Sequence, residues 1–532
     1  MKRKVLSILM CISLTAVMLM GCGGSKDSSQ STKSKDTKEA EIDEDATLVI
    51  PVTGDISSLN ALTQYSSEEG DMMLCGSVFE PMYRVGEDGT IEYFLAEKAE
   101  MNDDSTELTV TLANNAKWHD GEDLTTKDVQ FTFDALFNKK FTSSLSTGLI
   151  VNGEPVTLEV VDEHTFKIKL PSPAASFLQR FGMFYLLPEH LFSGVENMDT
   201  DELNQKGIGY GPYKVVEHVT GEKLVLERFD DYHKGKAPFA KVEYKVIPDA
   251  SAQELALQNG EINYFKTMDE TTIETYKNDD NYNVFVSPEG RINYLGLNKN
   301  SDITSDIKVR EAIIKALDIE KIVEGAYGSE NIATACSGGV VCAGGMYYNS
   351  KLPNFKQDLD GAKKLVEETG LSDKTIRLRY NTARPGMENV ALMIQQQCKE
   401  AGITVELTGL DSNALFADTL LNESSDWELF LNGYSSSGYP QYLKAMYATK
   451  GYYNPNMYVT DKVDQLWLDA DSLPTAEERQ QAYDDLFVEL QNTYSFVPIS
   501  STNNVIVTQN DYFGFENGSN ALGDFMKIYK TK

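Results

Sequence analysis

The sequence predicts an α/β or α+β protein with mixed sheets, divided into at least two lobes. Three observations lead to this prediction. The chain has 532 residues, more than a single hydrophobic core usually serves. From residue 46 onward, runs with the two-residue alternation of strands are interspersed with runs of helical spacing, the pattern of a protein that contains both elements. No repeat of fixed period is found along the chain.

The first segment, residues 1–21, has the pattern of an export signal. Three basic residues, Lys2 to Lys4, precede an apolar stretch from Val5 to Met20 that is too short for an ordinary transmembrane helix. The sequence LMGC, which ends at Cys22, resembles the lipobox of bacterial lipoproteins. This resemblance implies cleavage before Cys22 and acylation of its thiol. A plain signal peptide or a membrane anchor is the alternative.

The next segment, residues 22–45, predicts a disordered tether. It is rich in Gly, Ser, Lys and Asp, so it cannot bury enough apolar surface to fold. No later segment contains eighteen consecutive apolar residues, the length that would indicate another span. We therefore expect a protein anchored by lipid on the outer face of the cell membrane, extracellular or periplasmic, and held away from the bilayer by this tether.

The folded part is expected to start with the strand-like sequence ATLVIPVTG at residues 46–54. Alternation of apolar and polar residues predicts further strands at 108–112, 164–170, 223–229 and 241–247. Helical spacing is found at 251–261, 308–328, 358–371 and 476–493. Gly328 and Gly370 stand where a residue in the left-handed conformation would end a helix.

The stretch WHDGEDLTTKDVQFTFDAL, residues 118–136, places a histidine beside three acidic residues. Its spacing favours a turn and a helix start over a metal or catalytic site. Asp120-Gly121 suits a turn, and Thr125 with Asp128 has the spacing of a capping box. His119 has no second histidine at ligand spacing, so a structural role is expected.

Charge and cysteine content exclude some classes of partner. The formal net charge is −33, and such a surface repels phosphate backbones, so no nucleic acid is expected to bind. Cys336 and Cys342 lie in a Gly-rich loop where a disulfide could form in an oxidising compartment. Paired cysteines with histidine partners, as in a zinc site, are not found. We expect neither a metal site nor a cofactor.

Four segments in order resemble the family 5 extracellular solute-binding proteins, the cluster C components of ABC importers that bind oligopeptides, dipeptides or nickel. They are LTVTLANNAKWHDGEDLTTKDVQFTFDAL, residues 209–262 beginning GYGPYKVVE, RINYLGLNKN followed by KVREAIIKALDIEKIV, and DLDGAKKLVEETGL. The match runs from about residue 46 to the C-terminus. It implies transport of a solute, with peptide as the expected ligand, a permease as the membrane partner, a monomer and no enzymatic activity.

The resemblance also implies a fold. It is the two-lobed fold of the type II periplasmic binding proteins, with an inserted subdomain in the first lobe and a hinge of two segments. The first lobe would combine residues 46–83, 208–297 and 498–532, with the inserted subdomain at 84–207. The second lobe would span residues 298–497. The ligand would be enclosed between the lobes, and closure requires that it bind the closed form better than the open one.

The ligand-binding strand departs from the family pattern. In peptide-binding members, the segment matching FLNGYSSSGYPQYL, residues 430–443, carries an aspartate that pairs with the peptide's α-amino group. That position is Ser436 here, and no acidic residue occurs between Glu428 and Asp461. A charge-assisted hydrogen bond of this kind contributes about 1.5–3 kcal/mol. A cationic ligand terminus would therefore need another partner, or the ligand lacks one.

The resemblance assigns candidate ligand contacts from both lobes. They are Glu69 and Arg291 from the first lobe and Tyr434, Ser435, Ser436 and Tyr439 from the second. Phe430 stands where some oligopeptide binders place an arginine. Seven tyrosines lie between residues 434 and 458, and a tyrosine ring suits peptides, sugars and aromatic solutes alike. An oligosaccharide or a nickel chelate therefore remains an alternative ligand.

Two other functions remain open on the sequence. An exported hydrolase would need catalytic residues, but GxSxG and HExxH are absent and the five histidines are scattered singly. A carboxylate pair for glycoside hydrolysis cannot be located in a chain with 81 acidic residues. The Gly-rich sequence GIGYGP at 207–212 is followed by strand-like YKVVE rather than a helix, so it does not predict a phosphate loop. The second alternative is a lipoprotein sensor or adhesin.

Overall fold

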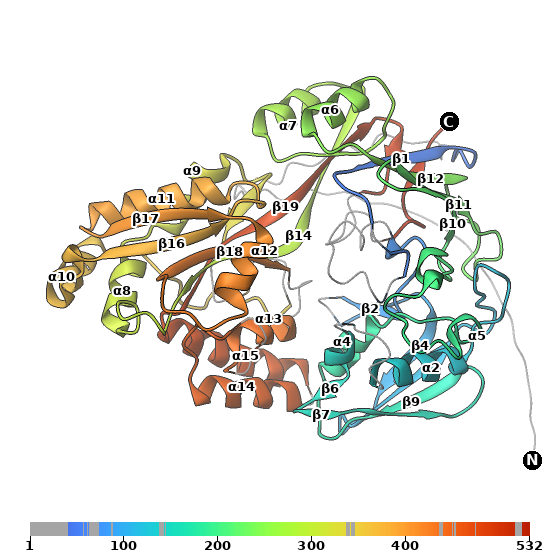
Figure 1. Cartoon of the computed structure of the whole chain (residues 1–532), viewed down its shortest axis with the longest axis horizontal. Coiled ribbons are helices and arrows are strands. Elements are labelled where there is room, and N and C mark those ends of the chain that lie inside the picture. Colours follow the sequence, from blue (N-terminus) through green and yellow to red (C-terminus); the bar gives the residue numbers. More distant parts are fainter. Residues whose placement is uncertain are drawn as a thin grey trace, which may run out of the picture. The chain divides into compact units, whose positions relative to one another are not determined.

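The computed structural model of the chain describes residues 41–56, 58–60, 62, 74–86, 89–137, 143, 145–336, 341, 346–435, 440–449, 451, 454–473, 475–515 and 524–532. Residues from Ile42 onward belong to one compact unit. Its elements are shown in Figure 1.

A mixed four-stranded sheet is built from strands that the alternation predicted. Its order is β1-β12-β11-β10, with bounds Thr47–Val52, Lys241–Val246, Lys223–Arg228 and Tyr213–Val219. β1 pairs with β12 in parallel, whereas the other pairs are antiparallel. Leu48 and Ile50 of β1 are fully buried, as their alternating positions require. The predicted strands at 46–54, 223–229 and 241–247 are confirmed.

A second four-stranded sheet is antiparallel. Its order is β4-β5-β9-β8, with bounds Ala96–Met101, Glu107–Leu112, Thr165–Lys169 and Thr157–Val160. Leu108, Val110 and Leu112 of β5 are fully buried on one face. The strands predicted at 108–112 and 164–170 are therefore confirmed. Short elements surround the two sheets: β2 Tyr83–Val85, β3 Ile91–Tyr93, α3 Leu145–Gly148, β6 Ile150–Val151, β7 Glu154–Pro155, α4 Phe177–Gly182, α5 Glu189–Phe192, the 3-10 helix η2 Glu202–Gln205, β20 Tyr512–Phe513 and β21 Tyr529–Lys530.

The stretch 118–136 folds as a turn and a helix. Gly121 has φ +98°, and helix α2, Thr126–Phe137, follows Thr125. The Asp128 carboxylate accepts hydrogen bonds from the backbone N–H of Thr125 and of Glu189, both at 2.9 Å. The Thr125 hydroxyl accepts from the backbone N–H of Lys127 at 3.3 Å rather than from that of Asp128. The predicted helix start is thus confirmed, with one cap bond displaced by a residue.

His119 holds two loops together. Its Nδ1 accepts from the backbone N–H of Gly209 at 3.2 Å, and its Nε2 lies 3.0 Å from the carbonyl oxygen of Gly211. Burial lowers the pKa of His119 to about 4, so the imidazole is neutral at neutral pH and uses one nitrogen as acceptor and the other as donor. The predicted structural role of this histidine is confirmed.

The largest sheet is mixed and contains seven strands. Its order is β13-β19-β14-β18-β16-β17, and β15 pairs with β19 beside this path. The bounds are Phe265–Lys266, Phe496–Gln509, Tyr282–Leu297, Leu429–Ser435, Thr375–Asn381 and Thr404–Leu410, with β15 at Ala333–Ala335. β16 pairs in parallel with β17 and β18, whereas β14 pairs antiparallel with β18 and β19.

Helices pack on both faces of this sheet. One group is α8 Ile307–Lys315, α9 Ile319–Tyr327, α10 Leu359–Thr369 and α11 Met387–Glu400, and the other is α13 Pro440–Tyr447, α14 Asp461–Ser472 and α15 Ala476–Asn492. Helices α6 Ala250–Gln258 and α7 Glu270–Lys277 lie beside β13, at the other end of β14. The remaining elements are the 3-10 helix η3 Leu371–Asp373, α12 Ser412–Leu415 and the π-helix η4 Phe416–Leu420.

The helical run at 308–328 is two helices rather than one. α8 ends at Lys315, and α9 starts after Asp318, whose carboxylate accepts from the backbone N–H of Lys321 at 3.2 Å. An aspartate in this position satisfies a free N–H at the start of a new helix. Gly328 and Gly370 have φ of +74° and +65° and end α9 and α10, as predicted.

The buried apolar residues form separate clusters. The first cluster contains residues of the two four-stranded sheets and of α2 and α4, between positions 48 and 264 and again between 506 and 528. The second and third clusters cover the two faces of the seven-stranded sheet. A smaller fourth cluster lies between α6, α7 and β19. Two chain segments, β14 and β19, contribute to several of these clusters.

Candidate functional site

Strands β14 and β19 form a long antiparallel ribbon that joins the separate cores. At one end, Val507 belongs to the fourth cluster and Ile506 to the first. At the other end, Leu295 and Val497 belong to the second cluster, and Phe496 to the third. The ribbon can be followed in Figure 1 from α6 and α7 to the sheet formed by β16, β17 and β18. Movement of one core relative to the other must therefore bend this ribbon.

The pairing of the ribbon is irregular near its middle. The register of β14 with β19 shifts between Pro288 and Ile292 and again between Asn293 and Tyr294. Gly290 lies within the first shift and has φ +68°, a conformation that glycine adopts without strain. Irregularities of this kind bend a strand and redirect its side chains. They occur here at the residues next to Arg291.

A cluster of charges surrounds Glu289 at this irregularity. The Thr502 hydroxyl donates to its carboxylate. Lys266 Nζ and Arg291 Nε each lie 3.6 Å from Glu289 Oε1. The Glu289 side chain is 22% exposed and that of Arg291 is 9% exposed. Lys266 and Arg291 thus both stand beside the Glu289 carboxylate.

Arg291 lies directly opposite Ser435 in the antiparallel pair of β14 and β18. The stem of Arg291 packs against Gly433, where an added Cβ would meet Arg291 Cδ at 3.0 Å and Asn293 Oδ1 at 2.5 Å. A larger residue at 433 would displace both side chains. Gly433 was not among the predicted site residues, although a glycine inside a strand signals the close approach of another group.

Tyr434 lies on the opposite face of the sheet from Arg291. It pairs with Ile292, the neighbour of Arg291, and successive strand residues point to opposite faces. Tyr434 is half-buried and packs against the third cluster. Arg291 and Tyr434 therefore occupy neighbouring positions of the β14–β18 pair, but their side chains lie on opposite faces of the sheet.

Polar side chains fix the ribbon on the Arg291 face. Asn293 donates through Nδ2 to the Tyr327 hydroxyl at 3.2 Å and to Ser500 Oγ at 3.1 Å. All three residues are buried, and burial raises the pKa of Tyr327. A satisfied buried network of this kind favours one arrangement of the strands.

The start of β18 is fixed by a buried carboxylate. Glu428 accepts from Arg377 Nη2 at 2.7 Å and Nε at 3.0 Å, and from the Ser301 hydroxyl at 2.7 Å. Burial alone would raise the pKa of Glu428, but the hydrogen bonds from Arg377 and Ser301 outweigh it and lower the pKa. The strand that carries Tyr434 is therefore anchored at its first residues.

Several predicted residues lie outside the part of the chain that the structure describes. They are Cys22, Glu69, Ser436, Tyr439 and Cys342. For Ser435 only the backbone is described. Cys336 is buried and disulfide-bonded, but the pairing with Cys342 stays a prediction.

Two of the seven tyrosines between 434 and 458 are explained by their surroundings. Tyr447 is fully buried in the third cluster, with its ring centroid 4.2 Å from that of Phe496. Tyr458 is 43% exposed, and the Arg310 guanidinium lies 5.4 Å from its ring centroid. Tyr447 is thus a core residue, and Tyr458 a surface residue held by a cation–π contact.

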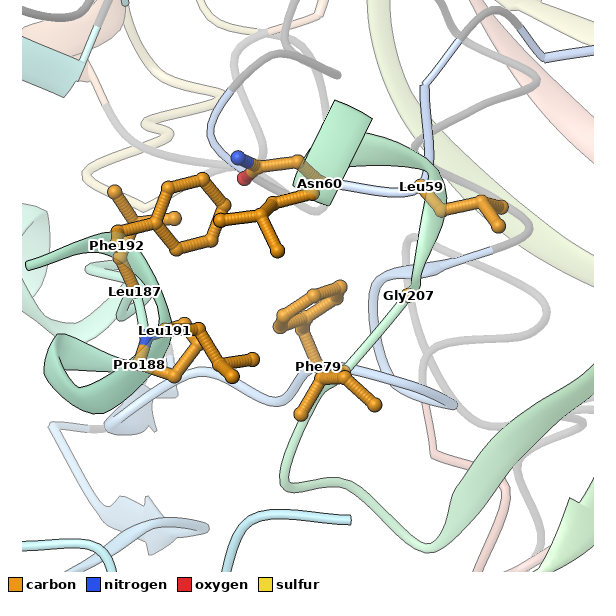
Figure 2. Close-up of a pocket in the computed structure, with 10 residues that line it drawn as sticks. Leu59, Asn60, Phe79, Leu187, Pro188, Leu191, Phe192 and Gly207 are labelled. Atoms are coloured by element: carbon orange, nitrogen blue, oxygen red, sulfur yellow. The ribbon is translucent and has the colours of Figure 1, made fainter. Parts of the chain in front are cut away.

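A small apolar pocket lies elsewhere, inside the body that contains the first cluster. Figure 2 shows its lining, to which Phe79, Leu191 and Phe192 contribute apolar side chains. Asn60 lies at its edge, where its amide donates to Asn204 Oδ1 at 2.7 Å. The space suffices for about one water molecule, so this pocket is too small for a solute.

No cluster of three or more His, Cys, Asp and Glu side chains arranged to hold a metal ion occurs in the part of the chain that the structure describes. The helices within the described ranges are all too short or too polar to cross a bilayer.

The profile of the bacterial extracellular solute-binding proteins, family 5 (middle region), matches residues 90–455. The matched region includes β14, which carries Arg291, and β18, which carries Tyr434.

Individual relatives extend this similarity over nearly the whole chain. The oligopeptide-binding protein AppA of Bacillus subtilis is 24% identical, covering 97% of both chains. The crystal structure of the ABC transporter substrate-binding protein CtaP from Listeria monocytogenes is 33% identical with a TM-score of 0.84, covering 92% of this chain and 100% of the other. NikZ of Campylobacter jejuni, solved in complex with Ni(L-His), shares the fold at 23% identity with a TM-score of 0.77, covering 91% of this chain and 99% of the other. The neighbours have the predicted two-lobed fold with mixed sheets.

Proposed function

Because the chain belongs to the family 5 bacterial extracellular solute-binding proteins, we propose that it is the lipid-anchored solute-binding component of an ABC importer. It captures a peptide between two closing lobes and delivers it to the permease in the membrane. The protein itself carries out no bond chemistry in this proposal. It acts as a monomer on the outer face of the cell membrane.

The ribbon of β14 and β19 is the observation that carries the proposal. It connects the cores, and its pairing is interrupted between Pro288 and Ile292. Two strands with an irregular middle suit a hinge, because a few residues can absorb the change in backbone angles. A ligand closes such a hinge only to the extent that it binds the closed form better.

The proposed boundaries follow the resemblance. The first lobe combines residues 46–83, 208–297 and 498–532, with residues 84–207 as its inserted subdomain. Residues 298–497 form the second lobe. Residues 1–21 are the signal peptide, and residues 22–45 the tether that begins at the acylated Cys22.

The proposed ligand site uses residues from both lobes. Arg291, next to Glu289 and Lys266, supplies a positive charge for a carboxylate of the ligand. Tyr434 supplies a ring face, and the backbone of Ser435 can pair with an extended peptide as an added strand would. Glu69, Ser436 and Tyr439 complete the proposed set.

Peptide is the proposed ligand class because the AppA relative, solved with a nonapeptide, is similar along its whole length. A nickel chelate is the second candidate, favoured by the fold shared with NikZ in its Ni(L-His) complex. A chelated metal needs few ligands from the protein itself, which fits a chain with five histidines. An oligosaccharide is a further alternative.

A thermal-shift screen of the full chain tests these candidates. Synthetic peptides, oligosaccharides and nickel–histidine complexes are added separately, and the unfolding temperature is measured. A ligand at a hundred times its dissociation constant stabilises the folded state by about 2.7 kcal/mol. We expect peptides to raise the unfolding temperature. The transport role would be refuted if no class did so while the protein turned over a chromogenic hydrolase substrate.

The assignment of Tyr434 can be tested by substitution. Tyr434→Ala should weaken binding of the peptide identified in the screen by about tenfold or more, because a ring face that covers a ligand contributes well over 1 kcal/mol. Tyr458→Ala, at an exposed tyrosine of the same segment, is the matched control. Unchanged affinity with intact folding would exclude Tyr434 from the site.

The lipid anchor has its own test. The Cys22→Ser variant should appear in the soluble fraction of the expressing cells, whereas the unaltered chain should remain with membranes because its acyl chains partition into the bilayer. Mass spectrometry of the N-terminal peptide would show the added lipid. A membrane-bound Cys22→Ser chain would contradict acylation at this residue.

A further inference from the structure

A direct contact joins two bodies that belong to different cores. Ala174 and Phe177, around the start of α4, are buried in the first cluster. Trp467 and Ala470, near the end of α14, are buried in the third cluster. Between these two bodies, the backbone N–H of Ala175 donates to the carbonyl oxygen of Asp471 at 2.8 Å. The contact therefore lies apart from the ribbon of β14 and β19.

Side chains reinforce this contact. The Asp471 carboxylate accepts from the backbone N–H of Ser176 at 3.3 Å and from the Ser176 hydroxyl. Both residues are almost fully buried, with 6% of Asp471 and 5% of Ser176 exposed. A carboxylate buried to this degree is costly unless hydrogen bonds satisfy it, and here the other body supplies the donors.

Neighbouring residues extend the same interface. Gln179 of α4 donates through Nε2 to the sulfur of Met346 at 2.9 Å. Lys444 of α13 is half-buried, and burial lowers the pKa of its ammonium group. The charge of Arg180 in α4 lowers this pKa further, whereas the charges of Asp471 and Asp464 raise it. Residues of α4 thus meet residues of α13 and α14 at one place.

We propose that Ser176 and Asp471 form a latch between the lobes that stabilises the closed arrangement and thereby sets how tightly the ligand is held. The contact itself is observed, whereas its assignment to the closed arrangement and its effect on ligand affinity rest on the proposed function. Opening would transfer the Asp471 carboxylate and the N–H groups of residues 175 and 176 into water. The latch is therefore made only when the lobes are closed.

The latch acts on affinity through the population of the closed form. When only a fraction of the free protein is closed, the measured dissociation constant equals that of the closed form divided by this fraction. Loss of the latch lowers the closed fraction, so the ligand binds more weakly although no ligand contact has changed. Asp471 and Ser176 are thus positioning residues, not ligand contacts.

The test uses the full chain and three variants. Asp471→Ala removes both side-chain bonds but keeps the backbone bond from Ala175. Ser176→Ala removes a single oxygen and is the safer change if Asp471→Ala does not fold. Asp469→Ala is the matched control, because this exposed carboxylate of the same helix accepts from Gln465 within α14.

Two measurements need no ligand. Small-angle scattering gives the radius of gyration of each variant, and hydrogen exchange reports on the peptide that contains Ala175 and Ser176. We expect Asp471→Ala to have a larger radius and faster exchange in that peptide, with Asp469→Ala like the unaltered chain. Unchanged radius and exchange in Asp471→Ala and Ser176→Ala would overturn the latch.

Calorimetric titration with a synthetic nonapeptide tests the second half of the proposal. We expect the dissociation constant to rise about tenfold in Asp471→Ala and about threefold in Ser176→Ala, as expected for losing a charge-assisted bond and part of one. The double variant should be no weaker than Asp471→Ala, since both changes remove the same contact. If Asp471→Ala has a larger radius of gyration but binds the nonapeptide with unaltered affinity, the proposed effect of the latch on ligand affinity is overturned.

Failure of the peptide to bind the unaltered chain would count against the proposed ligand class. In that case the scattering and exchange results still decide whether the latch exists.

Discussion

Replacement of Glu80 by glutamine should make the protein more stable at neutral and alkaline pH. Glu80 is 1% exposed. The Tyr232 hydroxyl donates to its Oε2, whereas its Oε1 has no hydrogen-bond partner among the described residues and lies 3.4 Å from His233 Nε2. Burial raises the pKa of Glu80 to about 8. Burial also lowers the pKa of His233, so burial disfavours the charged form of both groups.

The sign of the pH dependence follows from these shifts. A carboxyl group whose pKa is raised on folding stabilises the folded state most in its protonated form, and this contribution is lost as the pH rises through the folded pKa. Below about pH 4.5 the group imposes no penalty, and the penalty grows up to about pH 8. Each pKa unit corresponds to about 1.4 kcal/mol. As the pH rises from about 6 to about 8, the stability that Glu80 costs the folded state should therefore increase by about 2 kcal/mol.

The amide side chain introduced by Glu80→Gln would imitate the protonated carboxyl group at every pH. The measurement is urea denaturation at about pH 6, 7 and 8, followed by tryptophan fluorescence. One of the three tryptophans, Trp118, lies 5.1 Å from Tyr210 between ring centroids. Tyr210 in turn donates to the carbonyl oxygen of Glu80 at 3.0 Å. The stability difference between Glu80→Gln and the unaltered chain should increase by about 2 kcal/mol over this range.

The control is Glu100→Gln, which changes the same group at an exposed position of β4. It corrects for the general effect of removing one negative charge from an acidic protein. Burial lowers the pKa of His233, and this histidine is present in both chains. Lys234, Arg84 and Asp524 also act on Glu80 but are common to both chains. A stability difference that does not vary with pH would refute the reasoning.

Three further substitutions test local packing and hydrogen bonding, each by thermal unfolding. Gly433→Ala would place a methyl group 2.5 Å from Asn293 Oδ1, so a loss of about 1–3 kcal/mol is expected, and no loss would show that β14 and β18 can separate. Asp128→Ala removes the acceptor of two backbone N–H groups and should cost about 2 kcal/mol, unless water replaces the carboxylate. Arg377→Ala leaves the buried Glu428 with fewer donors and should cost about 3 kcal/mol, whereas an equally stable variant would mean that Ser301 suffices.

Local features of the fold were predictable from the sequence because they depend on neighbouring residues. The alternation in β5 and β9 follows from one buried face. The turn and cap around Thr125 follow from side chains within four positions of it. The break at Asp318 was missed, although an aspartate before Ile319 is a helix-start signal, because the apolar spacing continues across it.

The candidate site was predictable only in part. Arg291 and Ser435 were expected near the ligand from the family resemblance, and their direct pairing across β14 and β18 is now visible. That Tyr434 and Arg291 face opposite sides depends on the register, which the sequence of either strand does not fix. The bonds between Ser176 and Asp471 join residues 295 positions apart. No local pattern indicates such a pair, since the sequence around each residue predicts only an ordinary helix end.

The hinge and the latch together limit how strong the latch can be. The ribbon of β14 and β19 connects the lobes whether they are open or closed, so it does not itself favour closure. A latch that kept the free protein closed would block access of the ligand. The free energy that the latch contributes to closure must therefore be smaller than the free energy that the ligand contributes. Changing a two-state equilibrium from 1:99 to 99:1 requires about 5.5 kcal/mol, whereas hydrogen bonds that compete with water contribute about 0.5–3 kcal/mol each. One carboxylate with two donors from Ser176 lies within this limit, because it shifts the closed population without replacing the ligand as the cause of closure.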